Sequence, residues 1–167
     1  MKKIFRAVSI LFLVILMVGC KNTGDNTIPQ MTSQIEKRVK ITSGDEAYEC
    51  RVCHTPEGTT TINFISPKNL EGFTISESGG KYGVAQGDLQ GEYSKHPIME
   101  NSAIKYLIDV LDNLGSAERN FKYKSTEEGE RSYVGTLSGK ECEVVLNNKS
   151  EIIKVIVKDL GIKIDFI

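Results

Sequence analysis

The chain has 167 residues, of which 21 are Lys or Arg and 22 are Asp or Glu, so its formal net charge is −1 at pH 7. The charges are interspersed and form no basic stripe, which argues against a nucleic-acid partner because such a protein needs clustered cations to neutralise phosphates. With two histidines and no tryptophan, the sequence predicts no catalytic residue, no metal site and no cofactor.

The first twenty residues, MKKIFRAVSILFLVILMVGC, have the form of an export signal. Basic residues precede an apolar run, 7–18, that is too short for an ordinary membrane span. The run ends in Gly19-Cys20, which resembles a bacterial lipobox with Met17 at a position where Leu is usual. The resemblance implies that Cys20 is lipidated and becomes the first mature residue. The alternative is an ordinary signal peptide with a chance cysteine.

This interpretation divides the chain into three parts. Residues 1–19 are expected to be a lipoprotein signal peptide, and residues 20–32 a lipid anchor followed by a polar, flexible tether. Residues 33–167 have the length of a single domain. The acylated cysteine is expected to hold this domain on the extracytoplasmic face of the cell membrane. Without the basic residues of the leader, 18 basic residues remain against 22 acidic ones.

In chain order, the domain begins with a short helix expected at residues 33–39. Period-2 alternation of apolar and polar residues, broken by turn residues, then predicts an antiparallel meander. The expected strands before the main helix are 46–55, 59–66, 70–76, 81–86 and 89–93. Those after it are 120–125, 131–137, 140–146, 152–158 and 161–167.

The main helix is predicted by a single apolar stripe at helical spacing. Its residues are Ile104, Leu107, Ile108, Leu111 and Leu114. Asn101 or Ser102 can cap its start, and Gly115 stands where a C-terminal glycine belongs. About ten strands and one amphipathic helix predict an α+β, mostly antiparallel fold: a curved meander or half-barrel with the embedded helix as a lid.

Cys50-Arg51-Val52-Cys53-His54 matches the five-residue pattern that attaches a c-type haem, with His54 as the proximal ligand and Met99 as a candidate distal one. The strand pattern opposes this assignment, because residues three apart on a strand point to opposite faces. A haem protein therefore remains a distant third hypothesis. A zinc site from Cys50, Cys53, His54 and Cys142 fails for the same reason. A Cys50–Cys142 disulfide stays open.

The segments INFISPKNLEGFTISESGGKYGV and SEIIKVIVKDLGIKIDFI carry a resemblance to the lipoprotein-carrier superfamily, the LolA/LolB-like proteins, and in particular to its short clostridial forms. The resemblance covers about residues 46–167 and is one of pattern, without a catalytic motif. It implies a half-barrel whose apolar concave face holds acyl chains under a helical lid. Some clostridial relatives instead bind and activate a cell-wall amidase during spore formation.

Carried onto this sequence, the resemblance gives a set of cavity and lid residues. The inner face of the lid would be Ile104, Leu107, Ile108 and Leu111. The concave face would be lined by Phe64, Phe73, Ile75, Tyr82, Val84, Val155 and Phe166.

Two functions follow from these expectations. The first is a membrane-anchored, non-catalytic lipoprotein that binds a lipid or another apolar ligand, which needs an empty apolar cavity beneath the helix. The second is a protein-binding module at the cell surface, which needs a filled core and an exposed strand edge or apolar patch. A homodimer through edge strands is a further alternative.

Overall fold

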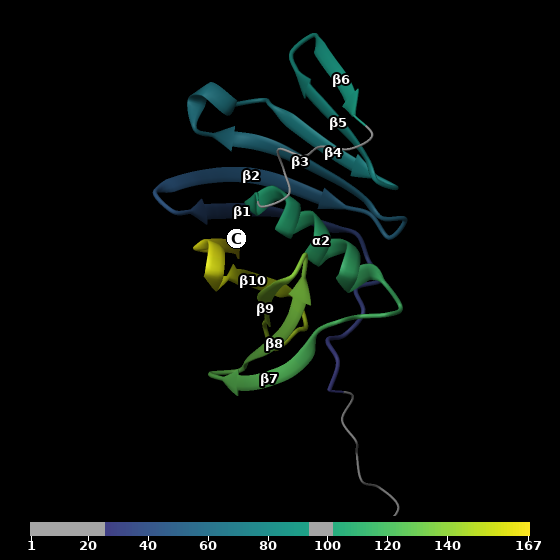
Figure 1. The fold of residues 1–167 in the computed structure, drawn as a ribbon, viewed down its shortest axis with the longest axis vertical. Helices are drawn as coiled ribbons and strands as arrows, with labels where there is room; N and C mark the ends of the chain where they lie inside the picture. Colours follow the sequence, from purple (N-terminus) through teal and green to yellow (C-terminus); the bar gives the residue numbers. More distant parts are fainter. Residues whose placement is uncertain (1–25, 94–101) are drawn as a thin grey trace, which may run out of the picture.

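The structure, a computed structural model, describes residues 26–93 and 102–167. Their strands form one antiparallel sheet of eleven strands in the order β6-β5-β4-β3-β2-β1-β11-β10-β9-β8-β7. The strands are β1 Ile35–Ser43, β2 Glu46–His54, β3 Thr59–Ser66, β4 Thr74–Ser78, β5 Lys81–Gln86, β6 Leu89–Tyr93, β7 Lys122–Glu127, β8 Glu130–Leu137, β9 Lys140–Leu146, β10 Ile152–Val157 and β11 Ile162–Phe166. The helix α2, Ala103–Gly115, lies against the concave face of this curved sheet (Figure 1).

The centre of the sheet is made by the two strands that are farthest apart in the sequence. β1 pairs on one side with β2 and on the other with β11, so that Val39 stands opposite both Cys50 and Phe166. All other neighbours in the sheet follow one another along the chain. The β1–β11 pairing therefore joins two meanders, β1–β6 and β7–β11, into one surface.

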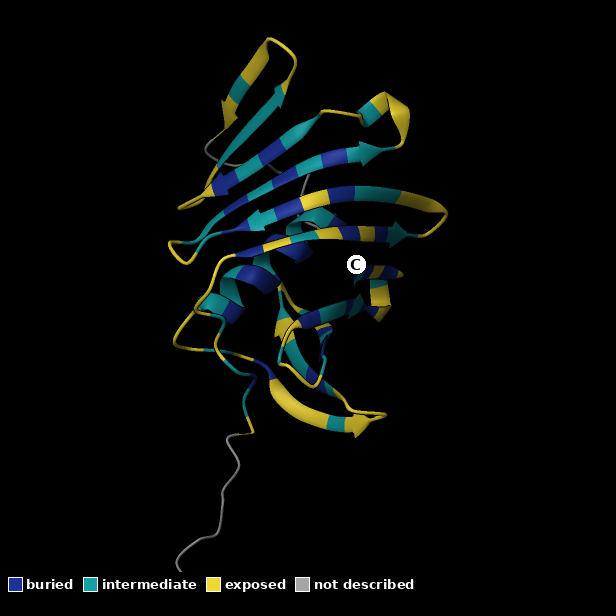
Figure 2. Cartoon of the chain, turned by 180° about the vertical axis from the view of Figure 1, so that it is seen from behind, coloured by how far each residue is buried: buried dark blue, intermediate teal, exposed yellow. Residues whose placement is uncertain are grey.

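The core lies between the concave face of the sheet and α2. The side chains of Leu107 and Leu111 are fully buried there, and Ile108 is 1% exposed. Figure 2 shows the corresponding alternation along the strands, with buried positions interleaved with more exposed ones. The helix begins where expected, because the Ser102 hydroxyl accepts a hydrogen bond from the Lys105 N–H over 3.2 Å. The space beneath the central part of the helix is thus filled by side chains.

The curved half-barrel with an embedded helix agrees with the fold class expected from the sequence, with eleven strands instead of about ten. The helix expected at residues 33–39 is wrong, since residues 35–39 belong to β1 and residues 33 and 34 precede it without helical structure. Ile35 and Val39 are four residues apart, a spacing that fits a helix and a strand equally well. Ile41 continues the alternation, and all three side chains are buried on the concave face.

The strand expected at residues 70–76 begins later than predicted. Residues Lys68–Leu70 form a short 3-10 helix, and β4 starts at Thr74. The two apolar residues expected to point inward do so: Ile75 is 7% exposed, and Phe73 packs against the core.

The chain before β1 is attached to the domain. Ile28 is fully buried, and its N–H donates to the Phe121 carbonyl over 3.1 Å. Thr27 forms an isolated antiparallel bridge with Lys122 of β7. The described part of the expected tether, from residue 26 onward, is therefore packed on the end of the sheet that carries β7.

Among the residues that the structure describes, no helix is long and apolar enough to cross a membrane. The expected signal peptide and Cys20 lie outside these residues.

Because α2 fills the concave face, shortening one of its buried side chains should destabilise the whole domain. We expect Leu111→Ala to lower the free energy of unfolding by about 2–5 kcal/mol, since it removes buried methyl groups and leaves a cavity. Urea denaturation of the soluble domain measures this as a lower midpoint at unchanged slope. Leu89→Ala, at a side chain that is 77% exposed, should change stability by no more than about 0.5 kcal/mol. An equal loss in both variants would contradict the role of α2 as the core of the half-barrel.

Candidate functional site

The predicted cavity and lid residues all come together on the concave side of the sheet, in different degrees of burial. Leu107, Ile108, Leu111, Phe64, Ile75, Val155 and Phe166 are buried members of the core. Ile104, Phe73, Tyr82 and Val84 are partly buried and pack against it. Most of these residues thus contact other side chains.

A pocket of about 320 Å³ remains at the start of α2. It is lined by Ile41, Ser43, Glu46, Tyr48, Phe64, Leu70, Ser102, Ala103 and Ile104. Phe64 and Ile104 are the only two predicted cavity residues in this lining. Ligand pockets typically span about 300–1,000 Å³, so this one is at the small end of the range. Sequence reasoning missed Ile41, Tyr48 and Leu70 because Ile41 lies next to the segment interpreted as a helix and Leu70 in the 3-10 turn.

A polar cluster lies beneath the C-terminal half of α2. His54, which is 4% exposed, has its Nδ1 2.9 Å from the Thr60 hydroxyl and 3.8 Å from Oδ1 of Asp112. Burial lowers the pKa of His54, so its ring is neutral at pH 7 and the contact with Asp112 is not an ion pair. Burial, followed by the nearby Glu77 and Asp109 carboxylates, raises the pKa of Asp112 to about 6. The buried Oδ1 atom of Asp112 has no hydrogen-bond partner among the residues that the structure describes.

The sequence offered no signal for this cluster, because its members come from β2, β3, β4 and α2 and meet only in the folded chain. Within the described residues, no group of three or more His, Cys, Asp or Glu side chains is arranged to hold a metal ion.

The cysteines of the haem-like motif stand on β2, where Cys50 is buried on the concave face and Cys53 lies on the opposite face. This placement agrees with the objection to haem attachment. Cys50, Cys53 and Cys142 are free thiols, so the Cys50–Cys142 disulfide is not formed. Burial raises the pKa of Cys50 and of Cys142 to about 12, which leaves both thiols unreactive. Met99 lies outside the described residues.

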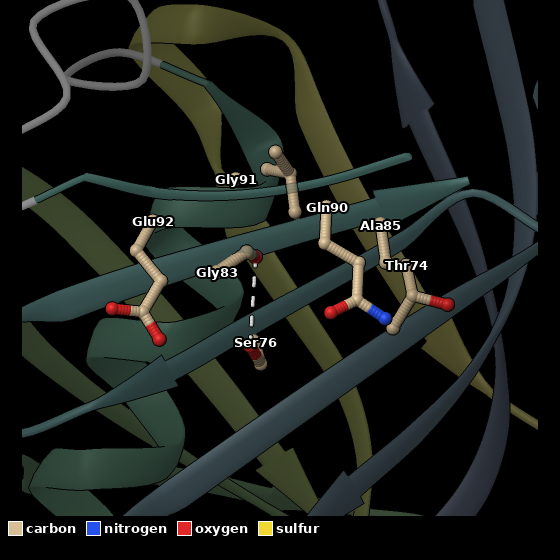
Figure 3. A pocket seen from close by; sticks show the side chains of 8 residues that line it. Thr74, Ser76, Gly83, Ala85, Gln90, Gly91 and Glu92 are labelled. Carbon is tan, nitrogen blue, oxygen red and sulfur yellow. Dashed lines mark hydrogen bonds between the residues drawn. The ribbon is translucent and has the colours of Figure 1, made fainter. Parts of the chain in front are cut away.

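Two of the grooves at the β4–β6 end of the sheet lie on opposite faces. The groove on the convex face has a volume of about 310 Å³ and is polar, with Thr74, Ser76, Gln90 and Glu92 around Gly83 (Figure 3). A Cβ atom at Gly83 would lie 2.5 Å from the Ser76 Oγ, so any other residue there would displace the Ser76 hydroxyl.

The groove on the concave face has a volume of about 210 Å³. Its apolar side chains are Phe73, Val84, Leu89 and Tyr93. Leu89 is 77% exposed and Tyr93 is 46% exposed, so this end of the sheet carries two of the four large hydrophobic side chains that are exposed among the described residues.

The two edges of the sheet differ in their protection. β7 carries Lys122 and Lys124, has a register shift opposite β8, and is bridged by Thr27. Lysines, irregular pairing and a covering segment are devices that prevent strand pairing with another chain. Within residues 26–93 and 102–167, β6 has none of them: its sequence LQGEY contains one charge, no lysine and no proline. No described strand pairs with its outer edge.

Comparison with known proteins gives no family model and no curated protein that matches this chain. Solved structures do match. An uncharacterized conserved protein from Thermus thermophilus has a TM-score of 0.53 at 11% identity, with 82% of this chain and 77% of that chain covered. The likeness to this structure shows a shared fold.

Two further structures are similar at lower scores. A LolA superfamily protein from Nitrosomonas europaea has a TM-score of 0.39 at 10% identity, with coverage of 84% of this chain and 86% of that chain. The complex of the CwlD amidase with the GerS lipoprotein from Clostridioides difficile has a TM-score of 0.42 at 17% identity, with coverage of 78% and 79%. A LolA superfamily protein is therefore one of the solved structures to which this chain is similar.

The raised pKa of Asp112 predicts a pH-dependent stability. Because the folded pKa, about 6, lies above the usual value of 3.8, the charged carboxylate costs stability at neutral pH, and the cost disappears as pH falls below both values. Its side chain is 41% exposed, so solvent screening reduces the effect, and Asp112→Asn should stabilise the domain by about 1 kcal/mol at pH 7.5. Urea midpoints at pH 7.5 and pH 4 measure the difference, which should shrink at pH 4.

Asp159→Asn is the matched control, since it makes the same change at a side chain that is 62% exposed. It should leave stability within about 0.5 kcal/mol at both pH values. A loss of stability in Asp112→Asn at pH 7.5 would mean that the carboxylate is favourably solvated or paired.

Proposed function

We propose that this chain is a non-catalytic lipoprotein, anchored through Cys20 on the extracytoplasmic face of the cell membrane, that binds a partner protein by β-strand addition to β6. The observation that carries the proposal is the contrast between a protected edge at β7 and an unprotected edge at β6. The filled space beneath the centre of α2 supports a binding role at the surface of the domain over one in its interior.

The two grooves at the β4–β6 end fit an added strand. Successive side chains of a strand point to opposite faces of the sheet. A partner segment beside β6 would therefore place alternate side chains toward the polar groove around Gly83 and toward the apolar groove beside Leu89 and Tyr93. In such complexes the backbone hydrogen bonds supply affinity and the alternating pockets supply specificity.

The register of the β5–β6 hairpin determines which backbone N–H groups of β6 are free to bond to a partner strand. β5 and β6 are joined by the two-residue turn Gly87-Asp88, where Gly87 has a positive φ of 57°, and Gln86 pairs with Leu89. Hydrogen bonding alternates along an antiparallel pair. Leu89, Gly91 and Tyr93 therefore bond toward β5, whereas the N–H groups of Gln90 and Glu92 point outward.

Gln90→Pro should abolish partner binding, because proline removes one outward N–H without removing a bond to β5. The test is photocrosslinking in the native host from a photoreactive residue at Glu92. We expect a photoproduct that is lost in Gln90→Pro and kept in Gln90→Ala, the control that retains the N–H.

A photoreactive residue at Lys122 on the opposite edge should give no such product. The proposal fails if the product persists in Gln90→Pro, if Lys122 gives the same product, or if Glu92 gives none. A product of twice the mass of the chain would assign the edge to a second copy of this protein, which corresponds to the homodimer expected as an alternative.

The pocket at the start of α2 supports a second candidate, an apolar ligand such as a fatty acyl chain. Its wall carries Ile41, Phe64 and Ile104, and its volume of about 320 Å³ is enough for a slim apolar group.

Ile104→Trp should fill this pocket and remove the binding of a fluorescent fatty acid to the delipidated, soluble domain. Leu89→Trp, which adds the same ring on an exposed strand, should leave the binding unchanged. Absence of binding by the unsubstituted domain, or equal binding by Ile104→Trp, would exclude an acyl ligand at this pocket.

A further inference from the structure

The segment that precedes β1 is held on the domain by several independent contacts. The Met31 N–H donates to the Leu114 carbonyl over 2.9 Å, and the Tyr123 N–H donates to the Asn26 carbonyl over 2.6 Å. The Arg119 side chain donates through Nε to the carbonyl of the buried Ile28 over 2.7 Å. This segment is therefore part of the folded body from Asn26 onward.

The attachment shortens the free chain between domain and membrane. If Cys20 carries the lipid, as in the proposed function on which this inference rests, the anchor lies only a few residues before Asn26. A fully extended chain spans at most about 3.6 Å per residue, so the reach is about 20 Å. A tether that stayed free until β1 begins at Ile35 would reach about 50 Å.

The free chain between Cys20 and Asn26 joins the folded domain at one end of the sheet. Asn26 and Thr27 lie beside Tyr123 and Lys122 on β7, at the opposite end of the sheet from β6 (Figure 1). Neighbouring strands are about 4.8 Å apart, so ten steps from β7 to β6 measure about 48 Å along the curved sheet. This separation is more than twice the reach of the free chain between Cys20 and Asn26.

We propose that the anchored domain has a fixed orientation, in which the β7 end faces the lipid headgroups and the β6 edge points away from the membrane. The surface that meets the headgroups is formed by Asn26, Thr27 and the exposed side chains of β7, among them Lys122 and Tyr123. The bilayer then covers the protected edge of the sheet, and the unprotected edge remains accessible to a partner in the envelope.

The test uses the full lipidated chain, reconstituted into phosphatidylcholine–phosphatidylglycerol vesicles that contain a headgroup-linked quencher. A fluorophore is placed at Lys122→Cys or at Leu89→Cys in a Cys53→Ser background, because Cys50 and Cys142 are fully buried and do not react. We expect most of the fluorescence to be quenched at position 122 and little at position 89.

A matched variant lengthens the free chain between Cys20 and Asn26 and leaves the folded residues unchanged. Inserting 24 Gly and Ser residues before Asn26 gives a flexible linker with a root-mean-square span of about 25–30 Å and a much longer maximal reach. Quenching at position 122 should fall several-fold in this variant. Equal quenching at positions 89 and 122, or quenching that does not respond to the insertion, would overturn the fixed orientation.

The results of this experiment distinguish failure of the fixed orientation from failure of the proposed function. Chain that does not stay with the vesicles would show that Cys20 carries no lipid, and would overturn both the anchor and the orientation. Strong quenching at position 122 together with a negative photocrosslinking result at Glu92 would keep the orientation and remove only the partner at β6.

Discussion

The pairing of β1 with β11 is the contact on which the rest of this structure depends. It places Val39 opposite Phe166 and joins two meanders that would otherwise be separate curved sheets. Only the joined sheet is wide enough to give α2 a continuous concave face, on which Leu107, Ile108 and Leu111 lose contact with water. The same pairing puts β6 and β7 at opposite edges of the sheet, so the structural difference between the two edges is spread across the whole width of the molecule.

Much of this fold can be predicted from local pattern, because the alternation of apolar residues and the turn glycines mark the strands. β3, β5, β6 and β9 have the predicted bounds, and α2 has the expected apolar stripe and its expected N-cap Ser102. The expected C-terminal role of Gly115 is wrong, because Gly115 is the last residue of the helix and Ser116 is the C-cap. The prediction fails at the start of β1 because Ile35 and Val39 fit two periodicities. The burial of Ile28 could not be predicted from the sequence, because a single apolar residue in a polar stretch forms no periodic pattern. Only the tertiary contacts with Phe121 and Arg119 show that Ile28 is packed on the domain.

The candidate site depends on tertiary structure to a greater extent. The predicted concave residues do face α2, but packing decides whether such residues enclose a space, and here most of them fill it. The cluster of His54, Glu77 and Asp112 likewise arises from elements distant in sequence. The sequence shows part of the difference between the two sheet edges, because it contains the lysines of β7 and shows that β6 has none. Only the topology shows that β6 and β7 are the edge strands.

The position of β11 at the centre of the sheet has a consequence for how the chain folds. β1 cannot complete its pairing until a partner near the far end of the sequence is present, as Val39 opposite Phe166 shows, so this one pairing closes a very long loop and is expected to form late in folding. A chain that is synthesised or exported N-terminus first therefore cannot form the central β1–β11 pair until β11 is available. If the chain is exported, as the proposed function requires, this delay is an advantage, because premature collapse would obstruct export.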